Sequence, residues 1–162
     1  MVENQTSSCR INILLVEDSR ADARLIKEIL REASRIDRVN LVADGAEAMA
    51  ALRREGRHAD DVRPDLVLLD LNLPKKNGRA VLGEMKKDPV LKTIPVVIVT
   101  SSAAECDVIE SYNLHANCYI TKPLALEDFT RVVRAIEEFW VGIARMPCGS
   151  TGPSASEAST IS

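Results

Sequence analysis

Short runs of apolar residues alternate along the chain with longer stretches in which apolar residues recur every three or four positions. The first pattern predicts buried β-strands, and the second predicts amphipathic helices. The predicted strands cover residues 11–16, 39–43, 66–70, 94–100 and 118–121. The predicted helices cover residues 19–33, 46–54, 79–87, 104–112 and 126–145.

The alternation of strand and helix favours an α/β domain with one parallel sheet, because parallel neighbours need a crossover between them. The unbroken apolar run at residues 66–69 is typical of a strand that is covered on both faces. Right-handed crossovers leave few topologies, and the common strand order for this size is 2-1-3-4-5. We therefore predict a doubly wound, five-stranded, flavodoxin-like fold that binds ligands at the carboxyl ends of its strands.

The composition suits one globular domain, with 162 residues of which 46% are hydrophobic and 28% are charged. We place this domain at residues 10–145. Residues 1–9 are predicted to form an N-terminal extension. Residues 146–162, which are rich in Ser, Gly and Pro, are predicted to form a flexible tail because they offer little apolar surface to bury.

The charge balance and the absence of certain segments narrow the expected partners. A formal net charge of −3 offers no basic excess to nucleic acid. No apolar run approaches the roughly 18–20 residues of a membrane span, and the N-terminus lacks the features of a signal peptide. We expect a cytoplasmic protein with no nucleic-acid or membrane partner. The four scattered cysteines are predicted to be reduced thiols that act as small hydrophobes.

Acidic residues follow two of the predicted strands. Glu17 and Asp18 come after the first strand, and Asp70 ends the third. These strands are neighbours in the predicted order, and neighbouring strands lie about 4.8 Å apart. Carboxylates held so close together repel one another unless a divalent cation or a raised pKa relieves them. All-oxygen ligands favour Mg²⁺, with Mn²⁺ as the alternative.

The same rim of the predicted sheet receives a hydroxyl and a cation. Thr100 ends the fourth strand, and Lys122 follows the fifth. A nucleophile, a metal, a cation and a hydroxyl donor are the parts of phosphoryl transfer to a carboxylate. Asp70 is the predicted nucleophile, and Lys122 is predicted to balance the charge on the transferred oxygens.

These residues stand in motifs that resemble the receiver domain of two-component response regulators. The matching stretches are ILLVEDS at 13–19, DLVLLDLNLP at 65–74, Gly78, IPVVIVTS at 94–101 and YITKP at 119–123. The resemblance implies that Asp70 accepts a phosphoryl group from a phosphohistidine on a partner histidine kinase. Such a protein is a signalling switch, not a classical enzyme.

The family also implies roles for the residues around Asp70. Asp18 and Asp70 would bind Mg²⁺ directly, Glu17 through water and Asn72 through its backbone carbonyl. Thr100 and Lys122 would contact the phosphoryl oxygens. Tyr119 would be the aromatic switch residue whose ring turns when Thr100 moves. The family typically has a cis peptide bond between Lys122 and Pro123.

A finer similarity is to small, stand-alone receivers that partner phytochrome-type kinases, several of which dimerise. It rests on DLNLPKKNG at 70–78, ANCY at 116–119 and the late Phe139-Trp140 pair. Because no DNA-binding domain follows residue 145, we expect output by protein contact or by passing the phosphoryl group on. Phe139 and Trp140 have two interpretations, either core residues or an exposed patch, and the second predicts a homodimer through the last helix.

Two other functions remain open at this point. An aspartyl-phosphate hydrolase also uses an Asp after a parallel strand, but it typically has a second Asp where this chain has Asn72. An interaction module that is not phosphorylated is the other alternative, against which the complete set of acid, threonine and lysine argues. We predict that His58 and His115 are solvated loop residues. The lysine pairs at 75–76 and 86–87 are also predicted to face solvent.

Overall fold

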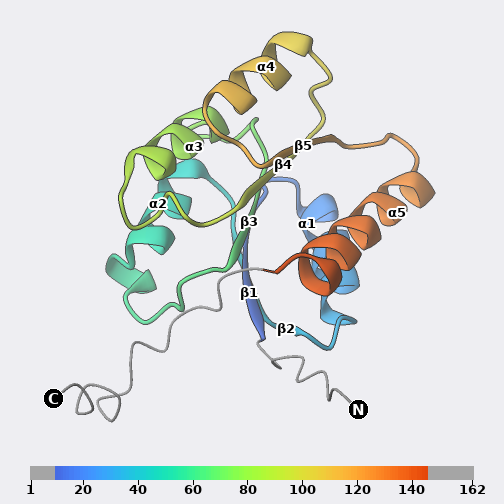
Figure 1. Ribbon diagram of the computed structural model, residues 1–162, viewed down its shortest axis with the longest axis horizontal. Helices are drawn as coiled ribbons and strands as arrows, with labels where there is room; N and C mark the ends of the chain where they lie inside the picture. Colours follow the sequence, from blue (N-terminus) through green and yellow to red (C-terminus); the bar gives the residue numbers. More distant parts are fainter. Residues whose placement is uncertain (1–9, 146–162) are drawn as a thin grey trace, which may run out of the picture.

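The computed structural model describes residues 10–145, which fold around one five-stranded parallel sheet (Figure 1). The predicted N-terminal extension and flexible tail, together with Cys9 and Cys148, lie outside the described residues. The sheet has the order β2-β1-β3-β4-β5, as predicted. The strands are β1 (Ile11–Val16), β2 (Ile36–Val42), β3 (Leu66–Leu69), β4 (Val96–Thr100) and β5 (Cys118–Thr121).

The helices occur in the predicted order along the chain, and three of them follow a residue whose side chain caps the first turn. They are α1 (Arg20–Arg31), α2 (Gly45–Arg53), α3 (Gly78–Lys87), α4 (Glu105–Asn113) and α5 (Leu126–Ile136), with a 3-10 turn at Gly56–His58. Ser19, Asp44 and Asn77 each accept a hydrogen bond from a backbone N–H in the first turn of the helix that follows. Such caps satisfy donors that have no partner inside the helix.

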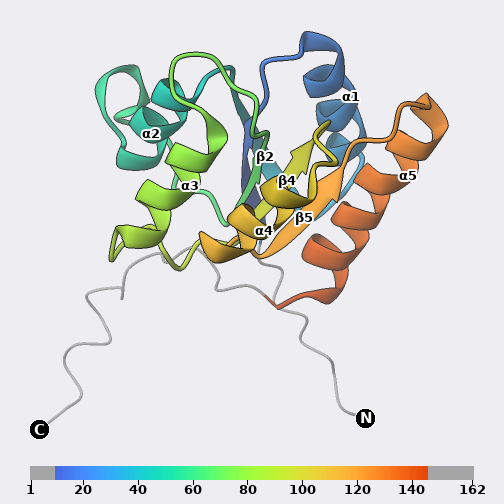
Figure 2. The ribbon, with the colours of Figure 1, turned by 90° about the horizontal axis from the view of Figure 1, so that it is seen from above.

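The helices cover both faces of the sheet, as Figures 1 and 2 show. α1 and α5 lie on one face, over a core that includes Ile13, Leu15 and Leu68. α2 and α3 lie on the other face, over a core that includes Leu14 and Leu69. Successive strand residues thus point to opposite faces, and β3 is fully buried along its length.

Several boundaries differ from the predicted ones for physical reasons. β4 begins after Pro95, which has no N–H to donate to the sheet. β2 begins earlier than predicted because it is an edge strand whose exposed Asp37 and Arg38 weaken the apolar pattern. The last helix is α-helical only to Ile136 and continues with π-helical turns over Glu137–Ile143. Among residues 10–145 no helix is both long and apolar enough to span a membrane.

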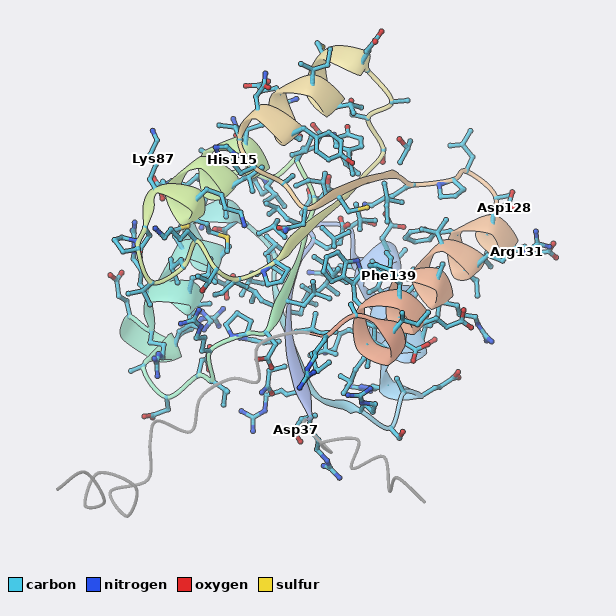
Figure 3. The ribbon with its side chains drawn as sticks, in the orientation of Figure 1. Asp37, Lys87, His115, Asp128, Arg131 and Phe139 are labelled. Atoms are coloured by element: carbon cyan, nitrogen blue, oxygen red, sulfur yellow. The ribbon has the colours of Figure 1, made fainter. Side chains whose placement is uncertain are left out.

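The prediction of a solvated loop was wrong for His58 and correct for His115. The His58 side chain is only 8% exposed; its Nδ1 pairs with Asp61, and its Nε2 lies 3.5 Å from Glu47. His115 is exposed and lies in the turn between α4 and β5 (Figure 3).

The lysine pairs are only partly solvated. Lys75 and Lys87 are exposed, but the ammonium of Lys76 bonds to Glu84 at 2.5 Å. The ammonium of Lys86 donates to the carbonyl oxygen of Ile94 at 3.1 Å, and burial lowers the pKa of this lysine. The acceptor of Lys86 thus lies in the loop before β4, and two adjacent lysines in the sequence do not reveal it.

Two further expectations need correction. The peptide bond between Lys122 and Pro123 is trans, since no cis bond occurs among the described residues. Cys106 is exposed on α4 and so is not a buried small hydrophobe, whereas Cys118 is partly buried against the core; both are free thiols.

Candidate functional site

Three carboxylates meet where β1 and β3 end. Val16 and Leu69 are paired in the parallel ladder, so Glu17 and Asp70 leave the two strands side by side. One oxygen from each of Glu17, Asp18 and Asp70 lies within 4.8 Å of the others. Glu17 and Asp70 are only 3% and 5% exposed, while Asp18 faces solvent. The sequence-predicted acidic cluster is therefore a compact set of oxygen atoms with one open side.

Backbone contacts hold these acids in register beyond the strand ends. The N–H of Asp70 donates to the carbonyl of Val16 at 3.0 Å, and the N–H of Glu17 donates to that of Val42 at 3.1 Å. Gly78 lets the start of α3 approach this edge, because a Cβ there would stand 2.2 Å from the carbonyl oxygen of Asp70. The acid positions are thus fixed by the sheet and by close helix packing.

Lys122 reaches into the cluster from the loop after β5. Its ammonium donates to Glu17 at 2.5 Å, to Asp22 at 2.9 Å and to Asp70 at 3.2 Å. The backbone N–H of Lys122 donates to the carbonyl of Thr100 at 2.7 Å, which fixes the root of this side chain. Only 6% of the Lys122 side chain is exposed, so its charge is balanced by these carboxylates and not by water.

Burial and pairing set the proton affinities of the site. Burial raises the pKa of Glu17 from 4.5 to about 7, although the hydrogen bond from Lys122 opposes that change. Burial by itself would lower the pKa of Lys122, but hydrogen bonds to Glu17 and Asp22 outweigh it and raise the pKa. Lys122 therefore stays a cation throughout the physiological range.

The donor set fits a hard divalent cation. It consists of carboxylate oxygens only, two of them buried, and the solvent-facing side leaves room for water ligands. The N–H of Asn72 donates to Oδ1 of Asp70 at 3.2 Å, so the peptide of Asn72 lies beside the cluster. Ligation through the Asn72 carbonyl stays a prediction, as does the choice of Mg²⁺.

Thr100 and Tyr119 are connected through one residue. Thr100 is completely buried at the end of β4, and its Oγ1 accepts a long contact of 3.5 Å from the N–H of Ser102. The hydroxyl of Tyr119 donates to the carbonyl of Ser102 at 2.8 Å. The Ser102 hydroxyl and the guanidinium of Arg79 both bond to Asp107, which ties this loop to α4 and α3. Thr100 and Tyr119 thus share Ser102 as a common backbone neighbour.

Asp22 is the site residue that the sequence analysis missed. It lies in the first turn of α1, four residues after Asp18, and contacts Lys122. Cα–Cβ bonds in a helix tilt toward its N-terminus, so an acid in the first turn of α1 can point back toward the strand end. That was the available signal, but acids in a first helical turn are common for reasons of helix stability alone.

Comparison with known proteins places these features in a wider group. The sequence profile described as "Response regulator receiver domain" matches residues 13–134. The response regulator Rcp1 of Synechocystis sp. is 50% identical over 135 residues, covering 83% of this chain and 92% of Rcp1.

Two solved structures are close in shape. The phosphorylated cyanobacterial phytochrome response regulator RcpA has a TM-score of 0.83 and 54% identity, covering 85% of this chain and 99% of that one. The Mn²⁺-bound form of Rcp1 has a TM-score of 0.81 and 51% identity with the same coverage of 85% and 99%. The carboxylate cluster thus lies in a fold that a metal-bound relative shares.

Proposed function

The chain belongs to the family of response regulator receiver domains, and from that membership we propose that Asp70 accepts a phosphoryl group in a two-component signalling pathway. A receiver domain is a signalling protein and not a classical enzyme. The observation that carries this proposal is the contact of Lys122 with Asp70 at 3.2 Å, beside two more carboxylates. Family membership also argues against an aspartyl-phosphate hydrolase, which typically has a second Asp at the position of Asn72.

The proposed reaction is an in-line displacement at phosphorus. An oxygen of Asp70 forms the new bond to phosphorus, and the bond from phosphorus to the histidine nitrogen of the kinase breaks. The imidazole, whose other ring nitrogen carries a proton, takes the electron pair of the broken bond and leaves as the neutral ring. Lys122 already touches Asp70, so its ammonium can bind an oxygen of the arriving group as Asp70 becomes an acyl phosphate.

We assign the metal of this reaction as Mg²⁺, held by Asp18 and Asp70 directly, by Glu17 through water and by the Asn72 carbonyl. When bound, the ion would neutralise charge on the transferred oxygens. The buried Glu17 and Asp70 suit the inner side of such a site, and the exposed Asp18 suits the side where water remains. The support for the site is that one oxygen from each of the three acids lies within 4.8 Å of the others; the division into direct and water-mediated ligands is the one that the family implies.

The proposed output is a change in protein contacts that starts at Thr100. Its hydroxyl would donate to a phosphoryl oxygen, giving up its long contact with Ser102. Because Ser102 also accepts the hydrogen bond of Tyr119, the ring of Tyr119 would be released to turn inward. Phosphorylation would shift a population between two packings of this region.

The acceptor is tested by incubation with acetyl phosphate and Mg²⁺ followed by intact-protein mass spectrometry. We expect one added phosphoryl group in wild type and none in Asp70→Asn. Asp60→Asn is the matched control, because Asp60 is an exposed acid away from the site and its loss should change nothing. Phosphorylation that persists in Asp70→Asn would refute the assignment.

The switch is tested with a phosphate mimic. The aromatic NMR signals of Tyr119 should shift when beryllofluoride is added to wild type but not to Thr100→Ala. Unchanged Tyr119 signals in wild type would count against the proposal. The mimic must bind in both proteins, which fluorine NMR of the bound group establishes.

We propose a phytochrome-type histidine kinase as the partner, acting in the cytoplasm. The support is the similarity to RcpA, whose name links it to a cyanobacterial phytochrome. Phosphotransfer from a panel of purified kinases would test this, since the cognate kinase should transfer fastest. Faster transfer from kinases without a phytochrome-type sensor would overturn the assignment.

We also propose a homodimer through the end of the last helix. Trp140 packs partly against the core, which agrees with the core interpretation, but Phe139 is 51% exposed and Ile143 is 75% exposed. Phe139 lies in the C-terminal turns of this helix (Figure 3). Light scattering on dilution should show a dimer in wild type and a monomer in Phe139→Asp. A monomer at all concentrations in wild type would refute the dimer.

A further inference from the structure

The ammonium of Lys122 has no hydrogen-bond donor to spare. A lysine ammonium carries three N–H donors and no acceptor. Glu17, Asp22 and Asp70 each accept one of them at 2.5, 2.9 and 3.2 Å. A phosphoryl oxygen that binds Lys122 must therefore take a donor from one of these carboxylates.

Asp22 differs from the other two acids in its place and surroundings. It comes from α1 and does not belong to the three-carboxylate cluster around the predicted metal site. Its side chain is 33% exposed, against 2% for Glu17 and 6% for Asp70. Its backbone N–H donates to the side chain of Ser19 at 3.3 Å, so the helix cap holds it in position. The start of a helix also favours a negative charge.

The fates of the three acids during the reaction differ as well. Asp70 loses its charge when it forms the acyl phosphate, and the donor it held becomes available. Glu17 faces the cluster that would hold the metal. Asp22 forms no bond to phosphorus and does not belong to the metal-facing cluster. Its charge therefore persists while the phosphoryl group, which is itself an anion, competes for the same ammonium.

We infer that Asp22 is a positioning residue that restrains phosphoryl acceptance: it holds one donor of Lys122 and keeps a negative charge beside the entry point of the phosphoryl group. This inference rests on the proposed function of Asp70 and deepens it. The restraint is electrostatic, and because Asp22 is partly exposed it weakens as salt screens the charge.

The test separates the charge of Asp22 from its shape. Asp22→Asn removes the charge and keeps an acceptor oxygen, while Asp22→Glu keeps the charge. At saturating Mg²⁺ and low salt, the rate of phosphorylation by acetyl phosphate should rise about threefold to tenfold in Asp22→Asn. The dissociation constant for beryllofluoride should fall by a similar factor, and both differences should shrink at high salt. Asp22→Glu should stay within about twofold of wild type.

Asp128→Asn is the matched control, because Asp128 is a first-turn acid of α5 and is 59% exposed. It tests for an effect of removing any such acid, and it should leave the rate and its salt dependence unchanged. Mg²⁺ affinity is measured separately for each variant by calorimetry, so that every rate is taken at saturation.

The outcomes are distinct. An unchanged or slower rate in Asp22→Asn, with folding intact by circular dichroism, would overturn the inference. A rate increase in Asp22→Asn that stays the same at high salt would show that the restraint is not electrostatic. If wild type takes up no phosphoryl group, or takes it up at a residue other than Asp70, the proposed function itself fails.

Discussion

Replacing Lys122 by Met tests how the buried charges of the site balance one another. Only 6% of the Lys122 side chain is exposed, and it bonds to Glu17 and Asp70, which are equally buried. Removing one partner of a buried ion pair costs about 3 kcal/mol, because the other charge stays uncompensated. We therefore expect Lys122→Met to lose about 3 kcal/mol of unfolding free energy at pH 8 without metal.

Magnesium should reverse most of that loss. Lys122 and a divalent cation neutralise the same acids, so a site without the lysine gains more from the ion. By thermodynamic linkage, each ~1.4 kcal/mol that Mg²⁺ restores corresponds to about tenfold tighter Mg²⁺ binding by the variant. Urea titrations with EDTA and with Mg²⁺ measure the two stabilities, and calorimetry measures the affinities.

Lys122→Arg is the control, because it keeps the positive charge. A loss of stability in Lys122→Met that is equal with and without Mg²⁺, together with unchanged Mg²⁺ affinity, would refute this reasoning. It would mean that Lys122 stabilises the protein through its packing and not through the carboxylates.

Three other predictions follow from the described contacts. Because burial raises the pKa of Glu17 from 4.5 to about 7, the folded protein holds this proton more tightly than the unfolded chain. Metal-free stability should therefore fall by up to about 3 kcal/mol between pH 4.5 and 7, and urea titrations should show a flatter profile in Glu17→Gln. Gly78→Ala should lose about 3 kcal/mol, because its Cβ would stand 2.2 Å from the Asp70 carbonyl; an unchanged melting curve would contradict that clash. Arg79→Ala removes the bond to Asp107, so hydrogen exchange in α4 should quicken more than in β3, and uniform exchange would count against this link.

The fold and the clustering of Glu17, Asp18 and Asp70 could be predicted from the sequence. Buried parallel strands are marked by unbroken apolar runs, and the carboxyl ends of neighbouring strands share one edge. An acid that directly follows such a strand is therefore placed in space by the topology. Lys122 was predictable for the same reason, since the end of β5 fixes where its side chain begins.

Residues placed by helices and loops were harder to predict. Asp22 points at Lys122, 100 positions away in the chain, and nothing local distinguishes it from an acid that merely stabilises a helix. His58 stands in a polar stretch that looks like a solvated loop. Its burial depends on Glu47 of α2 and on Asp61, and only the packing of that turn against α2 reveals these partners.

The site concentrates more negative charge than one lysine can balance. Glu17, Asp22 and Asp70 contact the ammonium of Lys122, and Asp18 lies with Glu17 and Asp70 in the carboxylate cluster. The rigid strands β1 and β3 hold the two buried acids together although their charges repel, because the ladder continues one residue past each strand. Such an arrangement costs stability that an apolar cluster would not, as is common where a site must bind charge. The excess charge is what allows the site to take a divalent cation, and Asp22 then limits how readily an anion follows.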